Sequence, residues 1–333
     1  MKLKGTKIFI TGGAGFIGSN LVKRFLQEGA TVKIYDNFAT GKPENLNGID
    51  TKVEIIKGDI LDKRKLVSAM KGADVVSHHA AQMELTIALG DPYFDLNANT
   101  VGTLNVLEAC VKNKVKKLIN ASSACVYGQK GDTPTKETDQ TNPNWQYGVS
   151  KLAAEKYCQI YSETYKFPVI SFRYSIIYGP NEWYGRVMSL FLKRAVEGKP
   201  IIIFGDGNQK RDFTHVSDVV QANVKAILDN KIKNEVFNVS TGIGTTIRDL
   251  AKLIQRFHEK KVRIIYDKKV KEGEVSKFFK RVRLPSELRN MILSYLKAQR
   301  LLDFKPALNL EQGIKEQLLW VEQNKTRWKK ISI

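Results

Sequence analysis

The sequence predicts an α/β fold built on a doubly wound parallel sheet. Short apolar segments alternate with segments of helical periodicity, and the first such pair is joined by a glycine-rich turn. The chain has 333 residues and 42% hydrophobic content, so it can bury a substantial core. One large domain or two unequal domains are expected at this length.

The first strand–turn–helix unit spans residues 8–26. Its apolar strand ends at Thr11, Gly12, Gly15 and Gly18 follow, and the next residues have apolar side chains at helical spacing. Glycine lets the backbone approach a pyrophosphate, and a helix N-terminus attracts an anion. Three glycines alone are a weak signal, but a strand before them and a helix after them predict a dinucleotide site.

The second and third strands carry the residues that would recognise the dinucleotide. Residues 31–35 end at Asp36, whose carboxylate can accept hydrogen bonds from both ribose hydroxyls of NAD and would repel the extra phosphate of NADP. Residues 53–60 end with Asp59, which can accept a hydrogen bond from the adenine amino group, and Ile60, which can pack on the ring. The sequence therefore favours NAD.

The fourth strand, residues 73–79, leads into Ala80, Ala81 and Gln82. Small side chains at this point let the backbone pass close to a cofactor. The two histidines that end the strand have no third ligand beside them, so no metal site is predicted.

Two later segments carry candidate catalytic groups. The fifth strand, residues 115–123, ends in Ser122 and Ser123, and Tyr147 and Lys151 follow at a spacing that places both side chains on one face of a helix. This pair is common by chance. Together with the serine strand end and the dinucleotide turn, it becomes a specific sign of acid–base chemistry.

The net charge and the spacing of the cysteines limit the classes of protein to which the chain can belong. The chain has 54 Lys and Arg against 34 Asp and Glu, a net charge of +20, but the basic residues are spread out, which favours a solvated surface over nucleic-acid or membrane binding. Cys110, Cys125 and Cys158 show neither metal nor disulfide spacing. Because no apolar run resembles a signal peptide or a membrane span, a reducing, cytoplasmic location is expected.

Over nearly its whole length, the chain resembles the extended short-chain dehydrogenase/reductase superfamily, in its branch of nucleotide-sugar epimerases and dehydratases. The resemblance rests on Thr-Gly-Gly-Ala-Gly-Phe-Ile-Gly (11–18), Asp36-Asn37, Gly-Asp-Ile (58–60), Ala80-Ala81-Gln82, Ser-Ser-Ala-Cys-Val-Tyr-Gly (122–128), Tyr147 with Lys151, Phe172-Arg173-Tyr174, Tyr178-Gly179-Pro180 and residues 205–213. It implies a Rossmann domain in residues 1–180, which also receives segments returning near 210–245. A smaller, interleaved α/β substrate domain would occupy residues 181–333.

The resemblance also implies the roles of single residues. NAD would be held by Gly12, Gly15, Phe16, Ile17, Gly18, Asp36, Asn37, Gly41, Asp59, Ile60, Ala80, Ala81, Gln82, Asn99, Tyr147, Lys151 and Tyr174. A nucleotide-diphosphate sugar would be bound by Ser123, Cys125, Tyr147, Phe204 and Arg211, where the Arg211 guanidinium suits the diphosphate. No residue is assigned to a metal.

The implied reaction is epimerisation at C4 of a nucleotide-linked hexose of the UDP-glucose/UDP-galactose type. Tyr147, as a phenolate, would take the proton of the 4-hydroxyl while a hydride passes to NAD⁺, and Ser123 would hydrogen-bond that hydroxyl. Lys151 and the cofactor would lower the pKa of Tyr147. A 4,6-dehydratase is less favoured, because Ala124 and Cys125 stand where dehydratases carry acidic residues.

Two other functions remain open at this point. In GDP-mannose 3,5-epimerases a cysteine that matches Cys125 is a second base, which would make this protein a 3,5- or 5-epimerase, but Tyr184 stands where those enzymes have their lysine acid. A non-catalytic, RNA-binding member of the fold would suit the net charge of +20. Such a protein would have no need for Ser123, Tyr147 and Lys151.

The family pattern is broken in three places. Ser175 and Ile176 replace residues that touch the substrate, and residues 271–274 replace a common Arg-Pro-Gly-Asp turn. The basic segment 275–292 is longer than usual and is predicted to form a solvated lid or an interface, with a helix over residues 286–297.

A homodimer is expected, because in the resembled family two long helices pair with their symmetry mates as a four-helix bundle. The helices predicted near residues 99–112 and 147–164 have the apolar faces that such a bundle needs. These faces comprise Val101, Leu104, Leu107, Leu152, Tyr157 and Ile160.

Overall fold

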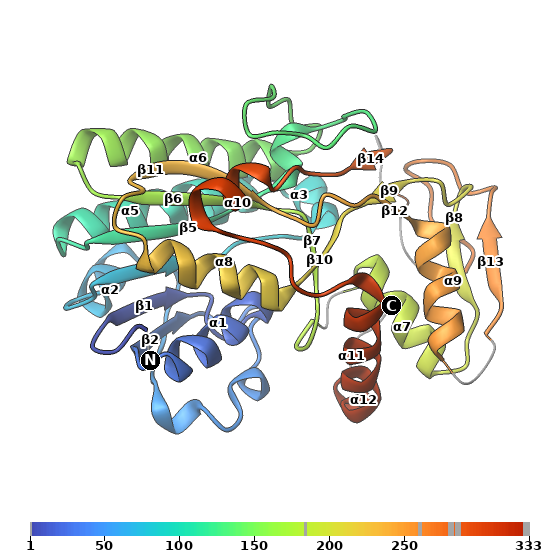
Figure 1. Cartoon of the computed structure of the whole chain (residues 1–333), viewed down its shortest axis with the longest axis horizontal. Coiled ribbons are helices and arrows are strands. Elements are labelled where there is room, and N and C mark those ends of the chain that lie inside the picture. The colour runs from blue at the N-terminus through green and yellow to red at the C-terminus, as the bar shows by residue number, and fades with distance from the viewer. Residues whose placement is uncertain (1, 183–184, 259–261, 279–282, 284–287, 329–333) are drawn as a thin grey trace.

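The computed structural model describes residues 2–182, 185–258, 262–278, 283 and 288–328. A seven-stranded parallel sheet forms its centre, in the order β11-β6-β5-β4-β1-β2-β3 (Figure 1). Its strands are β1 (Lys7–Thr11), β2 (Thr31–Asp36), β3 (Glu54–Lys57), β4 (Val75–His78), β5 (Lys117–Ser123), β6 (Val169–Tyr174) and β11 (Asn234–Val239). From β1 the chain adds β2 and β3 on one side, and it then adds β4, β5, β6 and β11 on the other side of β1. This change of side is typical of a doubly wound fold.

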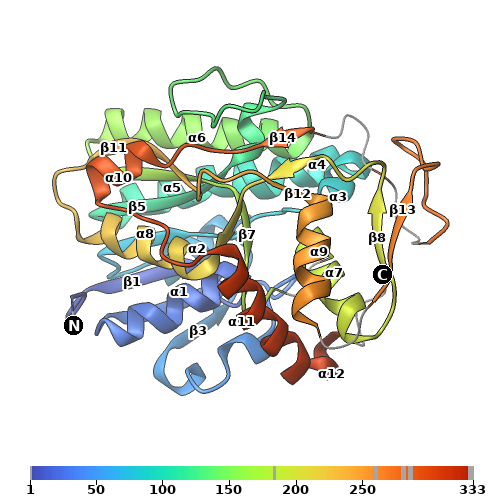
Figure 2. The same ribbon diagram turned by 45° about the vertical axis from the view of Figure 1, so that its right-hand side comes forward.

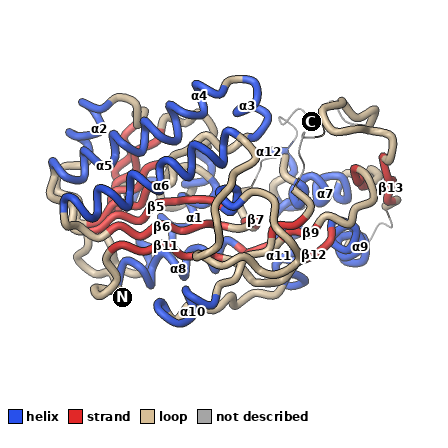
Figure 3. The backbone as a smooth tube through the Cα atoms, turned by 90° about the horizontal axis from the view of Figure 1, so that it is seen from above, coloured by secondary structure: helices blue, strands red, loops and turns tan. Residues whose placement is uncertain are grey.

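Helices cover both faces of this sheet (Figure 3). One face carries α1 (Phe16–Gln27), α8 (Val216–Leu228) and α10 (Leu296–Leu302), and the other carries α2 (Lys63–Ala69), α5 (Gly102–Lys112) and α6 (Gln146–Tyr165). Ile8 and Ile10 of β1 pack toward α1 and α8, whereas Phe9 between them packs toward α5. Strands buried on both faces confirm the predicted α/β architecture.

A smaller group of elements packs to one side of the main sheet (Figure 2). It contains α7 (Val187–Val196), α9 (Ile247–Phe257), α11 (Leu310–Gln323), β8 (Ile201–Phe204) and β13 (Ile264–Asp267). Leu192, Leu250 and Ile314, one from each helix, are fully buried in a core of their own. Strand β8 pairs in parallel with β13.

Short strands connect the two groups. These are β7 (Ile176–Tyr178), β9 (Lys210–Arg211), β10 (Phe213–His215), β12 (Thr245–Thr246) and β14 (Asn290–Met291). The remaining helical elements are α3 (Leu85–Gly90), α4 (Pro92–Leu96), α12 (Lys325–Trp328), a π-helical turn (Asn97–Val101) and 3-10 turns at Pro43–Leu46, Asp50–Lys52 and Ala124–Tyr127. No helix of the described residues is both long and apolar enough to cross a membrane.

The chain returns to the main sheet after it has built part of the smaller group. Strand β11 pairs with β6 from Asn234 opposite Val169 to Val239 opposite Tyr174. Helix α8, which precedes β11, covers one face of the same sheet. The division into a cofactor domain at residues 1–180 and a substrate domain at 181–333 stays a prediction.

The helix predicted over residues 286–297 is not formed at residues 288–295, and residues 286 and 287 lie outside the described part. Here β14 pairs with β9, Leu293 bridges to Thr135, and a helix begins only at Leu296. Leu288, Met291 and Ile292 have the i, i+3, i+4 spacing of a helix, but all three are buried in a strand-like segment. Pairing with the edge of β9 therefore overrides local periodicity.

Candidate active site

The glycine-rich turn is shaped by close backbone contacts. Gly12 has a φ of +72°, and a Cβ atom placed on it would lie 2.6 Å from the backbone nitrogen of Ala80. A Cβ atom on Gly18 would lie 2.1 Å from the carbonyl oxygen of Gly12. Because neither contact is tolerable, only glycine lets α1 start this close to β1 and to the segment after β4.

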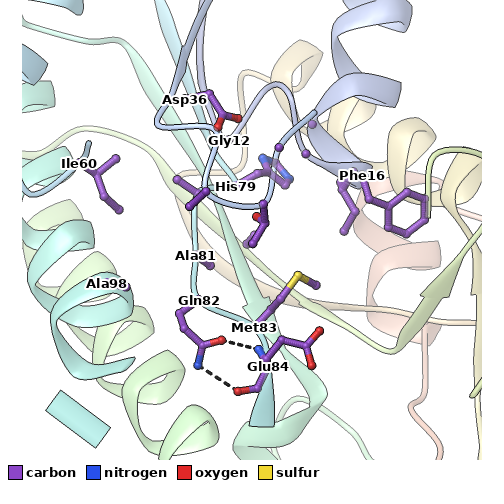
Figure 4. Close-up of a pocket in the computed structure, with 18 of the residues that line it drawn as sticks. Gly12, Phe16, Asp36, Ile60, His79, Ala81, Gln82, Met83, Glu84 and Ala98 are labelled. Carbon is purple, nitrogen blue, oxygen red and sulfur yellow. Dashed lines mark hydrogen bonds between the residues drawn. The ribbon is translucent and has the colours of Figure 1, made fainter. Parts of the chain in front are cut away.

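Asp36 is fixed at the end of β2, beside this turn (Figure 4). Its carboxylate accepts hydrogen bonds from the backbone N–H of Ala14 at 2.9 Å and of Phe38 at 2.8 Å. Burial raises the pKa of Asp36, and these two bonds partly offset the rise. Asn37 donates to the Asp59 carboxylate at 2.8 Å and so joins the ends of β2 and β3. The carboxylate and the backbone cradle fit a dinucleotide with free ribose hydroxyls.

A hollow of about 240 Å³ lies over this turn. All but one of the residues predicted to hold NAD line it, namely Gly12, Gly15, Phe16, Ile17, Gly18, Asp36, Asn37, Gly41, Asp59, Ile60, Ala80, Ala81, Gln82, Tyr147, Lys151 and Tyr174. We call it the cofactor hollow. Asn99 lies behind its wall, where it donates to Asp95 at 3.0 Å and to Ser150 at 3.1 Å. Asn99 thus braces α6 in this structure.

Ser123, Tyr147 and Lys151 meet at the inner end of this hollow. Ser123 ends β5, and its hydroxyl hydrogen-bonds the Tyr147 phenol. Burial raises the pKa of Tyr147 well above its usual value, whereas burial lowers the pKa of Lys151 to about 8. The expected lowering of the Tyr147 pKa by Lys151 is therefore not present in the protein alone, because desolvation dominates both groups.

A buried polar network holds α6, which carries Tyr147 and Lys151, against the sheet. Arg173 of β6 forms an ion pair with Glu155 of α6 at 2.6 Å, and Glu155 also accepts a hydrogen bond from Ser122 at 2.7 Å. Arg173 further donates to the hydroxyl of Tyr127 at 2.8 Å, and that hydroxyl donates to Asn238 of β11 at 2.7 Å. The network fixes the register of α6 with respect to β5, β6 and β11.

His79 is a lining residue that sequence reasoning did not assign to the site. Its ring stacks on Tyr174, and its Nε2 lies 3.2 Å from the tyrosine hydroxyl. Burial, assisted by the Lys151 charge, lowers the pKa of His79 to about 3, so the ring is neutral. Among the described residues, no group of three or more His, Cys, Asp or Glu could hold a metal ion.

A second hollow of about 360 Å³ adjoins the first at Ser123 and Tyr147. All residues predicted to bind the sugar nucleotide line it, namely Ser123, Cys125, Tyr147, Phe204 and Arg211. We call it the substrate hollow. Ser175 and Ile176 also line it, so this divergent loop still forms part of the wall, and the Ser175 hydroxyl lies 2.7 Å from that of Thr214.

Two arginines of the substrate hollow were missed from the sequence. Arg186 precedes α7 and lines both hollows. Arg283 lies beside Gly205 and donates to the carbonyl of Val270 at 2.9 Å. Tyr184, considered as a counterpart of a lysine acid, lies outside the described residues.

Cys125 lies in the substrate hollow, close enough to Tyr147 to affect its pKa. Burial raises the pKa of the Cys125 thiol, and the nearby Ser123 hydroxyl and the Arg186 and Arg211 charges only partly offset this. A thiol held in its protonated form is a poor proton acceptor at neutral pH.

The comparisons with known proteins agree with this geometry. The model of the NAD dependent epimerase/dehydratase family matches residues 8–240. A putative UDP-glucose 4-epimerase of Methanocaldococcus jannaschii is 36% identical over 324 residues, covering 95% of this chain and 99% of that protein. A UDP-N-acetyl-alpha-D-glucosaminuronate decarboxylase of Bacillus cytotoxicus is 32% identical over 329 residues, covering 95% and 98%.

Among solved structures, a UDP-glucose 4-epimerase from Thermotoga maritima with UDP-glucose is similar with a TM-score of 0.87 at 33% identity. The match covers 96% of this chain and 100% of that one. Most of the residues predicted to bind the cofactor and the substrate thus line two adjoining hollows, and the two relatives named above match 95% of this chain. The chain belongs to the NAD dependent epimerase/dehydratase family and is an NAD-dependent enzyme that acts on nucleotide sugars.

Proposed function

We propose that this enzyme catalyses reversible epimerisation at C4 of a UDP-sugar. The observation that carries the proposal is that Ser123 and Tyr147 line both hollows, while Lys151 lines the cofactor hollow with them. A sugar hydroxyl at Tyr147 would face the cofactor on one side and the rest of the substrate on the other. NAD, when bound, supplies hydride acceptance and return at the sugar carbon.

Each catalytic side chain has a distinct role in this proposal. The Tyr147 oxygen takes the proton of the 4-hydroxyl and returns it, while the Ser123 hydroxyl holds that oxygen in line. The Lys151 ammonium, on the same face of α6, binds the cofactor ribose and favours the phenolate once the site is filled. Because burial alone keeps Tyr147 protonated, we expect the phenol to become a base only in the assembled complex.

The substrate hollow would hold the rest of the UDP-sugar. Arg211 of β9 and Arg283 both line it, and two guanidinium groups suit a diphosphate. Phe204 at the end of β8 supplies an aromatic edge for the base.

The cysteine alternative is less favoured, because the Cys125 thiol is held in its protonated form. The dehydratase alternative is less favoured because Ala124 is buried and apolar where an acid would be needed. A non-catalytic, RNA-binding role would leave the Ser123–Tyr147–Lys151 arrangement without a purpose.

The test is to incubate the protein with a panel of UDP-, GDP-, CDP- and dTDP-sugars in heavy water and to identify products by NMR. We expect C4 epimers of a UDP-sugar without deuterium on any ring carbon, because the hydride never exchanges with solvent. Deuterium at C3 or C5 that disappears in Cys125→Ala would overturn the proposal in favour of the cysteine chemistry. A 4-keto-6-deoxy product would favour a dehydratase.

We further propose a homodimer formed through α5 and α6. Val149 and Ile160 of α6 are 53% and 54% exposed, and Val101, just before α5, is 38% exposed. Leu107, which was expected on this face, is fully buried against the sheet instead. Light scattering at micromolar concentration should give twice the monomer mass, and a monomer would refute this assembly. A cytoplasmic location likewise stays a prediction.

A further inference from the structure

A buried carboxylate lies on α4, behind the wall of the cofactor hollow. It belongs to Asp95, which is 1% exposed, and it accepts hydrogen bonds from Ser150 at 2.6 Å, Gln82 at 2.8 Å and Asn99 at 3.0 Å. Gln82 lines the cofactor hollow, and Ser150 directly precedes Lys151 on α6. The carboxylate therefore joins the wall of the hollow to the turn of α6 that carries Lys151.

The hydrogen bonds to Asp95 favour its charged form. Gln82 and Asn99 donate to Oδ1 and Ser150 donates to Oδ2, so both carboxylate oxygens have donors. Burial raises the pKa of Asp95, whereas the bonds from Ser150 and Gln82 and the charge of Lys151 lower it. The influence is mutual, because the charge of Asp95 raises the pKa of Lys151.

Asp95 is the acid near Lys151 whose charge is still available. Burial lowers the pKa of Lys151 to about 8, and negative charge on Cys158, Asp95 or Glu155 would oppose that fall. Burial raises the pKa of the Cys158 thiol to about 12, so this group is neutral at pH 7. Glu155 is already paired with Arg173 at 2.6 Å. Asp95 is thus left to balance the ammonium of Lys151.

The other titratable groups that face Lys151 do not supply this balance. Burial keeps His78 and His79, at the end of β4, neutral, because it lowers the pKa of both rings. Arg186 also lines the cofactor hollow, and its charge interacts with Glu182. Tyr147 lies on the same helix, and burial keeps its phenol protonated in the protein alone.

We propose that Asp95 is a positioning residue, the counter-charge that keeps the Lys151 ammonium charged at the inner end of the cofactor hollow. The inference rests on the proposed function, because Asp95 would act on the reaction through Lys151. A buried ammonium without a counter-charge is costly, since it has lost its water. The carboxylate offsets this loss without lining the hollow itself, so the ammonium keeps its N–H groups for the cofactor.

The direction of the effect on pH dependence follows from the charges. Removing the Asp95 charge removes an attraction for the ammonium, so the pKa of Lys151 should fall further. The same change removes a repulsion for the Tyr147 phenolate, so the pKa of Tyr147 should fall as well. Because the reaction needs a charged Lys151 and a deprotonated Tyr147, both limbs of the pH–rate profile should move to lower pH.

The experiment titrates Lys151 directly, by NMR of the NAD-loaded protein labelled with ¹³C at lysine Cε. The Lys151 signal is identified by its absence from Lys151→Met. We expect the titration midpoint of Lys151 to fall by about one pH unit in Asp95→Asn. Asp95→Glu, which keeps the charge, should restore part of the shift. Ser150→Ala removes a hydrogen bond and no charge, so its midpoint should stay close to that of wild type.

Asp218→Asn is the matched control. Asp218 is also 1% exposed and accepts a backbone hydrogen bond, from Ala307 at 2.8 Å, but it lies on α8, on the opposite face of the sheet from α6. This variant should lose stability in a thermal melt without moving the Lys151 midpoint. In assays with UDP-glucose, kcat of Asp95→Asn should at least equal that of wild type near pH 6 and be about tenfold lower near pH 9.

A Lys151 midpoint in Asp95→Asn that matches wild type would overturn the inference, and so would an equal shift in Asp218→Asn. If Asp95→Asn does not fold, Lys151→Met tests the same pair from the other side. The midpoint of Asp95, followed at its ¹³Cγ, should then rise, and an unchanged midpoint would overturn the inference.

Failure of the proposed function would look different. If the Lys151 midpoint falls in Asp95→Asn but wild type yields no C4 epimer from any UDP-sugar, C4 epimerisation fails and the charge pair stands. If C4 epimers form and the midpoint does not move, C4 epimerisation stands and the charge pair fails.

Discussion

The cofactor hollow and the substrate hollow are built in different ways. The first is formed by consecutive strand–helix units, in which glycine and small residues bring the backbone itself to the ligand, as at Gly12 and Gly18. The second is formed by side chains from segments far apart in the chain, such as Cys125, Arg211 and Arg283. The shape of the cofactor hollow is thus set by backbone contacts that only glycine permits. The shape of the substrate hollow depends on a few side chains that can be replaced. Cofactor choice should therefore be robust, and substrate choice easily altered.

The largest expected effect is at Tyr147, where the two hollows meet. Tyr147→Phe should lower kcat by about 10²–10⁴-fold, because it removes the acid–base group and leaves the walls of both hollows intact. NAD content of the purified variant, measured after denaturation, should match wild type. A variant within tenfold of wild type would place the catalytic base elsewhere.

A steric change in the cofactor hollow should have the next largest effect. Gly18→Ala places a Cβ atom 2.1 Å from the Gly12 carbonyl oxygen, so α1 must shift or the turn must open. We expect NAD to bind about 10- to 100-fold more weakly by calorimetry. Gly131→Ala is the control, since a Cβ atom there meets nothing within 4 Å. If both variants bind NAD with the affinity of wild type, the glycine turn does not restrict the position of α1.

A charge change in the same hollow should be milder. Asp36→Asn keeps an acceptor for the ribose but removes the charge that would repel a 2′-phosphate, so the preference for NAD over NADP should fall roughly tenfold. Competition calorimetry with both dinucleotides measures this ratio. An unchanged ratio would mean that backbone geometry, and not Asp36, selects the cofactor.

The smallest effect is expected in the substrate hollow. Cys125→Ala removes a protonated thiol that only lines the wall, so kcat/KM should change by less than about threefold. Steady-state assays with the preferred UDP-sugar provide the measurement. A loss comparable to that of Tyr147→Phe would make Cys125 a chemical participant and would favour the cysteine-dependent epimerase.

The same contrast explains what the sequence can predict. The strands, the glycine turn, Asp36 and the Tyr147–Lys151 pair could all be found because each lies in a short stretch with its own signature. Arg186 and Arg283 could not, since only the tertiary fold brings them to the hollow. The helix expected from residue 286 failed for a related reason, because pairing with a distant strand outweighs local periodicity.

The direction of the pKa shift of Tyr147 is another property that the sequence does not predict. A lysine one turn away suggests a lowered value, but the sign is decided by how much water reaches the phenol, and burial is a property of the whole fold. The sequence can therefore identify the acid–base pair without indicating its state in the protein alone.

The late return of β11 has a consequence for how the chain is made. During synthesis, β6 is complete long before residues 234–239 leave the ribosome, and in between the ribosome must produce α7, β8 and α8. Until then β6 presents an unpaired edge, and Phe172, which later packs against Phe237 of β11, lacks that neighbour. In a nascent chain paused in this interval, the exposed edge of β6 could bind chaperones or pair with other chains and aggregate. The pairing of β11 with β6 ends this exposure.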